Sequence, residues 1–278
     1  MNYRHIFHAG NFADVTKHVI LTLLLRHLRS KEAGFCVLDT HAGIGRYDLT
    51  TEPAQATQEY TAGIGRLFGR PCPHLALEPL LALVATLNRD GALRWYPGSP
   101  LIARDSLRPQ DRLIAVELHP DDARSLKREF AGDRHVAVHH MDGYQALKAH
   151  LPPKEKRGLI LIDPPFENRD EHAALVEAIR GACGRFSTGC YAIWYPIKER
   201  AAIWRFHEAL AATGIRKILI AELTTTDEQD WSRFNGSGMA LINPPWQLDQ
   251  DLPAILAALH QSLAANAGGA KVAWLVPE

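Results

Sequence analysis

The sequence lacks long uninterrupted apolar stretches. Hydrophobic residues make up 46% of its 278 residues, but the apolar run from Val19 to Leu25 ends at Arg26, well short of the roughly 20 residues that a membrane-spanning helix needs. The N-terminus also lacks the apolar segment and small-residue cleavage site of a secretory signal. We therefore expect a cytoplasmic protein that makes no contact with a membrane.

The patterns of common metal sites are also missing. The four cysteines form no C-x-x-C pair, so reduced and mostly buried thiols are expected. The fourteen histidines include no H-E-x-x-H motif, and the pairs His5/His8 and His139/His140 have no cysteine or carboxylate ligand at a useful spacing. We predict that the protein uses no metal.

An excess of charge of one sign is absent, since 31 Lys and Arg balance 31 Asp and Glu. A nucleic-acid binder with this composition must use a local basic patch. The N-terminal segment is the best place for one, because its only acidic residue is Asp14. Its basic residues are Arg4, His5, His8, Lys17, His18, Arg26, His27 and Arg29. A solvated helix face would have the same composition, and the sequence leaves both interpretations open.

Short apolar runs alternate with helical patterns along the chain, without internal repeats. Strands buried on both faces are predicted at 35–40, 112–118, 136–141, 158–162, 191–195 and 217–223. Helices are predicted between them at 121–130, 172–183 and 199–213. This alternation is typical of an α/β fold with a doubly wound, mostly parallel sheet. The loops that follow the strands should then share one edge of the sheet.

Three further segments complete the predicted architecture. A helix at 13–28 precedes the first strand, and its apolar face should consist of Val15, Val19, Leu21, Leu24 and Leu25. Residues 48–97 are too many for a single strand-to-helix connection and contain an apolar helical pattern at 75–87, so they predict a small helical insertion. The main domain then consists of residues 1–47 and 98–278. A strand, a helix and a strand are expected at 238–243, 252–263 and 271–276.

Polar residues end three successive predicted strands. The first strand leads into a small loop with Gly43 and Gly45, which matches neither the dinucleotide fingerprint nor the P-loop. Glu117 ends the second strand and could accept hydrogen bonds from both hydroxyls of a ribose. Asp142 could bind the amino group of an adenine while Gly143 leaves room for the ring. Each feature alone is also an ordinary turn, but together they predict a site for a nucleoside-like cofactor.

The strongest single motif is Asp163-Pro164-Pro165-Phe166, which follows the apolar strand at 158–162. Prolines cannot continue a strand ladder, so they fix a rigid turn at the cofactor edge. Hydrogen bonds from an exocyclic amine to the Asp163 carboxylate and the Pro164 carbonyl would free the nitrogen lone pair to attack a methyl group. Phe166 would stack on the flipped-out base. The alternative is a strand-ending turn with a core phenylalanine.

A second motif, Asn243-Pro244-Pro245-Trp246, also follows an apolar strand. Its strand comes too late in the chain to end at the cofactor edge. We expect this strand to run antiparallel near the edge of the sheet, which would direct the motif away from the cofactor loops. We therefore interpret the motif as structural.

Long motifs resemble the RlmJ family of ribosomal RNA adenine-N6 methyltransferases of the large subunit. The resemblance covers essentially the whole chain. It is carried by Tyr3 to Asn11 with Asp14, Lys17 and His18, by Leu38 to Gly43, by Tyr96 to Pro100, by Leu159 to Pro165, and by Trp274 to Glu278. One position departs from the family pattern, because the catalytic motif commonly ends in tyrosine and here ends in Phe166. Stacking survives this change, whereas a hydrogen bond from the hydroxyl is lost.

The resemblance implies a class I (Rossmann-like) methyltransferase fold that uses S-adenosylmethionine. The implied cofactor contacts are His18, His41, Ser99, Glu117, Asp142, Gly143 and Asp163. Tyr3 would lie near the RNA and the cofactor mouth, and we add Arg4 and Lys17 as expected RNA contacts.

The leading hypothesis is methyl transfer to N6 of one adenine in 23S rRNA, with the cofactor leaving as S-adenosylhomocysteine. The substrate would be naked RNA or an early precursor, and no obligate protein partner is evident. An adenine-N6 DNA methyltransferase has the same motif chemistry but usually needs a target-recognition domain, which this chain does not obviously contain. A non-catalytic RNA-binding module is disfavoured because Asp163 and Glu117 are both present.

Overall fold

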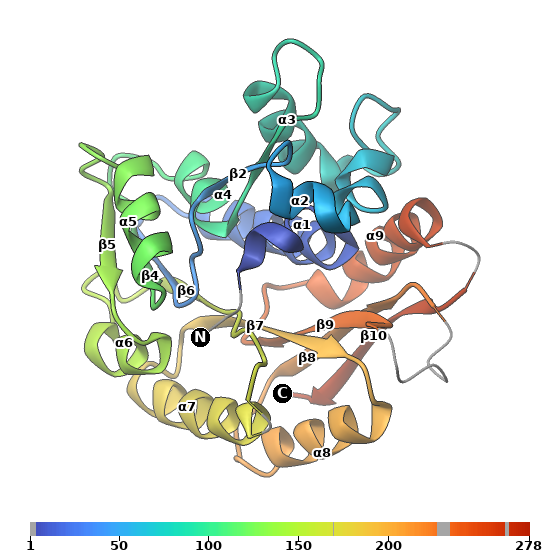
Figure 1. The fold of residues 1–278 in the computed structure, drawn as a ribbon. Coiled ribbons are helices and arrows are strands. Elements are labelled where there is room, and N and C mark those ends of the chain that lie inside the picture. Colours follow the sequence, from blue (N-terminus) through green and yellow to red (C-terminus); the bar gives the residue numbers. More distant parts are fainter. Residues whose placement is uncertain (1–3, 169, 227–233, 265–266) are drawn as a thin grey trace.

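A central eight-stranded sheet organises the molecule, with helices on both of its faces (Figure 1). The computed structural model describes residues 4–168, 170–226, 234–264 and 267–278. The strand order is β10-β8-β9-β7-β6-β1-β4-β5. The bounds are β1 (Cys36–Asp39), β4 (Arg112–Glu117), β5 (Val136–His140), β6 (Gly158–Ile162), β7 (Cys190–Ile197), β8 (Ile218–Thr224), β9 (Gly236–Ile242) and β10 (Gly269–Val276).

Strand direction divides the sheet into two parts. The strands β5, β4, β1, β6 and β7 are parallel neighbours. Beyond them β9 runs antiparallel to both β7 and β8, and β10 runs antiparallel to β8. The predicted doubly wound, mostly parallel sheet is confirmed. The carboxyl ends of the five parallel strands therefore meet at one edge.

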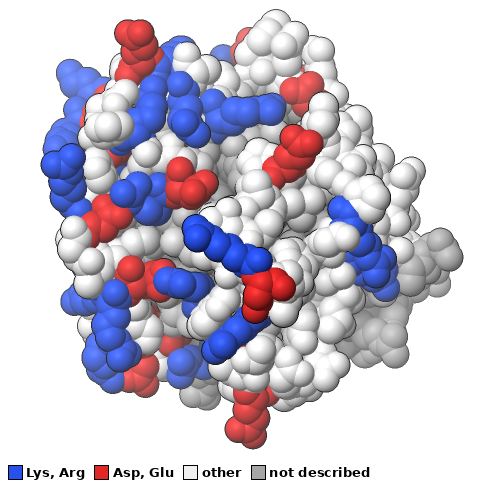
Figure 2. All heavy atoms as spheres, turned by 90° about the horizontal axis from the view of Figure 1, so that it is seen from above, with Lys and Arg blue, Asp and Glu red and all other residues white. Residues whose placement is uncertain are grey.

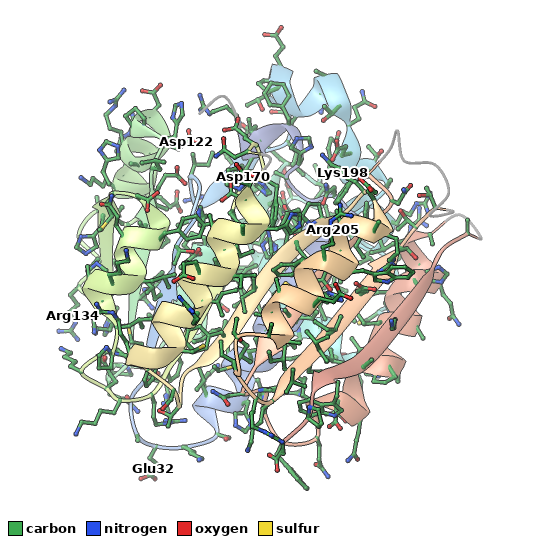
Figure 3. All side chains as sticks on the ribbon, turned by 90° about the horizontal axis from the view of Figure 1, so that it is seen from below. Glu32, Asp122, Arg134, Asp170, Lys198 and Arg205 are labelled. Carbon is green, nitrogen blue, oxygen red and sulfur yellow. The ribbon has the colours of Figure 1, made fainter. Side chains whose placement is uncertain are left out.

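Alternating side chains of the strands build a core on each side of the sheet. In β6, Leu159 and Leu161 join the core on one face, and Ile160 and Ile162 join the other. The second face is covered by α6 (Gly143–His150), α7 (Glu171–Arg185) and α8 (Arg200–Ala211) (Figure 3). The prediction that every strand is buried on both faces is wrong for β5, because β5 is an edge strand whose Ala137 and His140 are exposed.

The opposite face carries α1 (Phe12–Arg29), α4 (Ser99–Asp105) and α9 (Leu248–Leu263), with α5 (Pro120–Glu129) beside β4 and β5. Helix α1 begins after Asn11, whose side chain accepts a hydrogen bond from the backbone N–H of Asp14 at 2.9 Å and so caps the helix. The predicted apolar residues of α1 are all buried, as expected. None of the helices in the described ranges has both the length and the apolar character to cross a membrane.

The segment at 48–97 is largely helical and packs onto α1. The short strands β2 (Arg46–Asp48) and β3 (Trp95–Pro97) pair at its base. Between them lie α2 (Glu52–Thr57), the short 3-10 helices η2 (Glu59–Thr61), η3 (Ile64–Arg66) and η4 (Leu75–Leu77), and α3 (Glu78–Leu87). Ile64, Leu77 and Leu80 belong to the same core cluster as Val15 and Val19 of α1. The division of the chain into a main domain and an inserted subdomain stays a prediction.

The motif at Asn243 follows the antiparallel strand β9, as predicted. Its end of the sheet is the one where the parallel strands begin, because Ile242 pairs with Tyr191 at the start of β7. Asn243 has a backbone φ of +52°, and its side-chain amide donates hydrogen bonds to the carbonyls of Ser187 and Gly189, both at 2.8 Å. The Asn243 side chain thus stabilises the loop that contains Ser187 and Gly189 and leads into β7.

This arrangement predicts a purely structural role for Asn243. Asn243→Ala removes two hydrogen bonds and places alanine at a positive φ, so the free energy of unfolding in urea should fall by about 1–3 kcal/mol. Asn243→Gly should lose less, because glycine adopts this backbone conformation without strain. Equal stability of the alanine variant and the wild type would contradict the assignment.

Candidate active site

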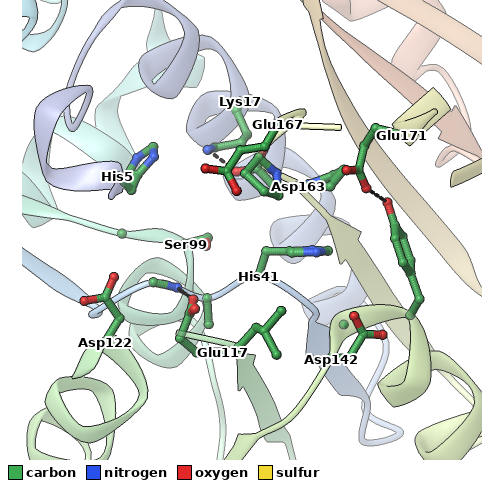
Figure 4. Close-up of a pocket in the computed structure, with 18 of the residues that line it drawn as sticks. His5, Lys17, His41, Ser99, Glu117, Asp122, Asp142, Asp163, Glu167 and Glu171 are labelled. Carbon is green, nitrogen blue, oxygen red and sulfur yellow. Dashed lines mark hydrogen bonds and ion pairs between the residues drawn. The ribbon is translucent and has the colours of Figure 1, made fainter. Parts of the chain in front are cut away.

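A cavity of about 680 Å³ lies at the edge where the parallel strands end, within the range typical of small-molecule sites. Its lining includes all seven residues predicted to contact the cofactor, which are His18, His41, Ser99, Glu117, Asp142, Gly143 and Asp163. In the view of Figure 4, Glu117 and Asp142 lie on one side of His41, and Asp163 and Lys17 lie on the other. Figure 3 shows Asp122 and Asp170 at this edge and Glu32 at the opposite one.

Glu117 at the end of β4 is tied to the loop that follows β1. Its Oε2 accepts a hydrogen bond from Gly43 N at 2.9 Å, and its Oε1 accepts one from His119 N at 2.7 Å. Burial raises the pKa of Glu117, and the two backbone N–H groups partly offset that rise. Each carboxylate oxygen has a second lone pair, so this buried group keeps acceptor capacity for a ligand diol.

Asp142 and Gly143 begin α6. The Asp142 carboxylate caps the helix by accepting a hydrogen bond from Gln145 N at 2.8 Å. A Cβ atom at Gly143 would lie 2.6 Å from the carbonyl oxygen of Thr40 and 2.8 Å from the His41 ring. Glycine is therefore needed here for the close contact between α6 and the loop after β1.

His18 and Ser99 form a buried part of the cavity wall. The His18 ring lies 2.8 Å from the Tyr96 hydroxyl through Nδ1 and stacks on the Tyr96 ring. Burial lowers the pKa of His18 from 6.5 to about 3, so its imidazole is neutral at physiological pH. Burial also raises the pKa of Asp39 at the end of β1 to about 7, despite a hydrogen bond from Ser99 that favours the carboxylate.

Asp163 belongs to a buried charge cluster with Lys17 and Asp14. The Lys17 ammonium lies 2.5 Å from Asp163 Oδ2 and 2.8 Å from Asp14 Oδ1, and only 5% of the Lys17 side chain is exposed. Burial by itself would lower the pKa of Lys17, but the two carboxylates outweigh it and hold the pKa above its ordinary value. Lys17 is therefore a permanent cation beside Asp163.

A second cavity, of about 170 Å³, is also lined by Asp14, Lys17 and Asp163. The two cavities share four residues, His5, Lys17, Asp163 and Pro165. The smaller one is distinguished by aromatic and proline side chains, namely Phe166, Trp194, Pro196 and Phe234. Asp163 is thus part of the wall that both cavities have in common.

Phe166 lines the second cavity and not the first. Its ring centroid lies 4.9 Å from that of His172 and 5.8 Å from that of Trp194. Its backbone has a φ of +50°, which is uncommon for an aromatic residue. The turn after Pro165 therefore holds the ring next to Trp194 by a strained backbone conformation.

Several lining residues were not identified from the sequence. Tyr144 and Glu171 join α6 to α7 across the larger cavity through a 2.5 Å hydrogen bond (Figure 4). Trp194 lies within β7 and lines the smaller cavity. The apolar run around it predicts a strand but gives no sign that this residue lines a cavity. Within the described residues, no three His, Cys, Asp or Glu side chains gather closely enough to hold a metal ion.

The three residues expected to contact RNA have different surroundings. Tyr3 lies outside the described residues. Arg4 forms an ion pair of 2.7 Å with Asp122, a residue that lines the larger cavity. Lys17 is buried and lines both cavities, so it can meet a base that enters a cavity but not the outer RNA backbone.

The surface charge is mixed in sign. On the face seen in Figure 2, Lys and Arg side chains gather on the side where α5 and β5 lie in Figure 1, with Asp and Glu side chains among them. Ion pairs such as Arg46 with Glu129 and Arg94 with Asp48 account for part of this mixture. A polyanion would meet local groups of basic residues on this face.

The burial of His18 predicts a specific pH dependence. Because its pKa is about 3 in the folded protein and about 6.5 when unfolded, its contribution to stability is complete above pH 6.5. It should decline below that by about 1.4 kcal/mol per pH unit. NMR titration should find a neutral His18 ring from pH 8 to 5, and His18→Gln should unfold in urea with a weaker pH dependence. A folded-state pKa near 6.5 would contradict this.

Comparisons with known proteins identify the family of this chain. The family model RsmJ, described as "Ribosomal RNA large subunit methyltransferase D, RlmJ", matches residues 32–276. Ribosomal RNA large subunit methyltransferase J of Escherichia coli (strain K12) is 48% identical, and its counterpart of the same name in Haemophilus influenzae is 46% identical, with both chains covered in full in each case.

One solved structure is similar over nearly the whole chain. A protein of family DUF519 from Legionella pneumophila str. Philadelphia 1 aligns with a TM-score of 0.88 and 35% identity, over 96% of this chain and 98% of the other. Together with the strand order, these matches confirm the predicted class I methyltransferase fold. The chain belongs to the RlmJ family of ribosomal RNA large subunit methyltransferases.

Proposed function

We propose that this protein transfers a methyl group from S-adenosylmethionine to N6 of one adenine in 23S rRNA. The observation that carries the proposal is the position of Asp163 in the shared wall of two cavities. The larger cavity has the polar groups that a nucleoside cofactor needs, and the smaller one has the aromatic side chains that a base needs. A reaction between two ligands requires adjoining sites, because the reacting atoms must approach to within about 3–3.5 Å of each other.

The residues of the larger cavity fit the cofactor by their chemistry. Glu117 would accept the ribose hydroxyls, Asp142 would accept the adenine amino group, and the wall at His18 and Ser99 would enclose the rest of the molecule. Bound S-adenosylmethionine supplies a methyl group on a positively charged sulfur. The two carboxylates of Asp14 and Asp163 outnumber the single Lys17 ammonium, which favours a cation near Asp163.

The acceptor base would enter the smaller cavity and lie against Phe166. Lys17 binds Asp163 Oδ2, so Oδ1 is the oxygen that would accept a hydrogen bond from N6. The Pro164 carbonyl would accept the second N6 hydrogen. These two bonds would hold the amine and draw its lone pair out of conjugation with the ring. After the nitrogen attacks the methyl group, the Asp163 carboxylate would accept the proton that the amine loses. Trp194 and Phe234 would exclude water from the base.

The choice of RNA rests on the family and on the N-terminal residues. Relatives at 46–48% identity carry the name of ribosomal RNA methyltransferases of the large subunit. Arg4 and Tyr3 precede the first described helical turn and would meet RNA at the cofactor mouth, while Lys17 would meet the flipped base. Naked 23S rRNA or an early precursor in the cytoplasm is the proposed substrate, without an obligate protein partner.

The two carboxylates should have separable roles. Glu117→Ala should weaken S-adenosylmethionine binding by about 1.5–3 kcal/mol in calorimetry, since hydrogen bonds to a charged group are lost. Asp163→Ala should keep much of that affinity and abolish transfer of a labelled methyl group to 23S rRNA. Asn243→Ala is the matched control, because its Asn-Pro-Pro motif lies at the other end of the sheet, and it should keep wild-type turnover per folded molecule.

The same assay distinguishes the substrates. 23S rRNA from cells that lack the protein should accept methyl groups at one adenine, identified by mass spectrometry, and duplex DNA should not. Methylation of duplex DNA alone would favour the DNA methyltransferase.

The two variants also test which motif is catalytic. Activity that survives in Asp163→Ala but is lost in Asn243→Ala would place the active site at the second motif, Asn243-Pro244-Pro245-Trp246.

A further inference from the structure

The inserted segment makes close polar contacts with the N-terminal residues that lead into α1. Glu59 of η2 lies 2.9 Å from His8 Nδ1 through Oε1, and its Oε2 accepts a 2.9 Å hydrogen bond from Asn11 Nδ2. Ile64 N donates to the carbonyl of Gly10 at 2.8 Å. The Thr57 hydroxyl donates to the carbonyl of Phe7. Residues 7 to 11 are therefore bonded to the insertion along almost their whole length.

The backbones of the two segments are also in direct contact. A Cβ atom at Gly63 would lie 2.0 Å from the carbonyl oxygen of Gly10 and 2.5 Å from the carbonyl carbon of Asn11. Gly10 has a φ of +78°, and a Cβ atom there would lie 3.0 Å from Cγ2 of Ile64 and 3.3 Å from Cβ of Tyr60, both in the insertion. No side chain fits between these backbones, so the position of residues 10 and 11 depends on the insertion.

Hydrogen bonds lead from these residues to the catalytic carboxylate. Asn11 Oδ1 accepts from Asp14 N. The Asp14 carboxylate in turn binds Gly10 N at 3.0 Å, the His5 ring at 2.8 Å and the Lys17 ammonium at 2.8 Å. Lys17 then binds Asp163 at 2.5 Å. Glu59, Asn11, Asp14 and Lys17 thus connect the insertion to Asp163, with the backbone N–H of Asp14 as the link to Asn11.

We propose that the insertion is a positioning element of the active site, with Glu59 as its positioning residue. Glu59 fixes the turn at His8 to Asn11, that turn fixes Asp14, and Asp14 holds Lys17 against Asp163. Glu59 also lines the smaller cavity, so the insertion forms part of the wall around the acceptor base. The inference rests on the proposed role of Asp163 in methyl transfer and assigns the inserted segment a part in that reaction.

A positioning role affects turnover more than cofactor binding. Glu59 is absent from the lining of the larger cavity, so the affinity for S-adenosylmethionine should stay within about twofold in Glu59→Ala. The rate of methyl transfer per folded molecule should fall at least tenfold, because Lys17 and Asp163 lose their fixed geometry. Glu59→Gln should recover part of the rate, since its amide oxygen can still accept a hydrogen bond from Asn11.

Two controls separate positioning from loss of stability. Glu52→Ala removes another acidic residue of the insertion, an exposed one at the start of α2, and should keep wild-type kinetics. Gly63→Ala should reproduce the loss of turnover by displacing Gly10, while Gly184→Ala, where a Cβ meets open space, should not. If Gly63→Ala fails to fold, the comparison of Glu59→Ala with Glu59→Gln still tests whether Glu59 positions the active site.

Single-turnover rates with saturating S-adenosylmethionine and 23S rRNA would be measured beside Asp163→Ala and the wild type. A rate for Glu59→Ala within threefold of the wild type would overturn the inference. A rate loss matched by an equal loss of cofactor-binding sites would also overturn it, because it would reflect unfolding. If Asp163→Ala itself is active, the proposed function fails first, and this outcome is recognised independently of Glu59.

Discussion

A buried lysine between two carboxylates holds the two halves of this active site together. Lys17 lies in α1, and Asp163 follows β6 at a separation of 146 residues. Removing one partner of such a buried pair typically costs about 3–5 kcal/mol, because the remaining charge is left without compensation. Asp14 contributes the second negative charge, and His5 and Lys17 outweigh burial to hold the pKa of Asp14 well below its ordinary value. The cluster is stable only when the N-terminal segment and the end of β6 are both in position.

This constraint keeps the cavity proposed for the cofactor next to the cavity proposed for the base. Both cavities include Lys17 and Asp163, and the fixed carboxylate keeps them adjacent. The cofactor side is built from the parallel strands, whose ends supply Glu117 and Asp142. The aromatic side is built from β7 and the residues before β9, which supply Trp194 and Phe234. The insertion adds Glu59 to the lining of that side.

The sequence predicts the sheet and its functional edge because these depend on local patterns. Apolar runs identify the strands, and the glycine loop after β1 together with Glu117, Asp142 and Asp163 identifies the ends of β1, β4, β5 and β6. Residues at or just after all four ends line the larger cavity. The charge cluster could not be predicted, because the approach of Lys17 to Asp163 and of Glu59 to Asn11 depends on how distant segments pack. The same reason explains why the predicted burial of β5 on both faces was wrong. The sequence of β5 does not indicate that this strand lies at the edge of the sheet. The roles of His18, His41 and Ser99 came from the family resemblance alone.

We propose that cofactor and acceptor occupy adjoining cavities and meet beside Asp163. The most direct test is a crystal structure with S-adenosylhomocysteine and a short RNA that contains the methylated adenine. This arrangement predicts the cofactor product beside Glu117 and Asp142 in the larger cavity. It predicts the adenine against Phe166 in the smaller one, with N6 within hydrogen-bond distance of Asp163 and the Pro164 carbonyl. An adenine bound away from Phe166, with N6 beyond the reach of Asp163, would contradict it.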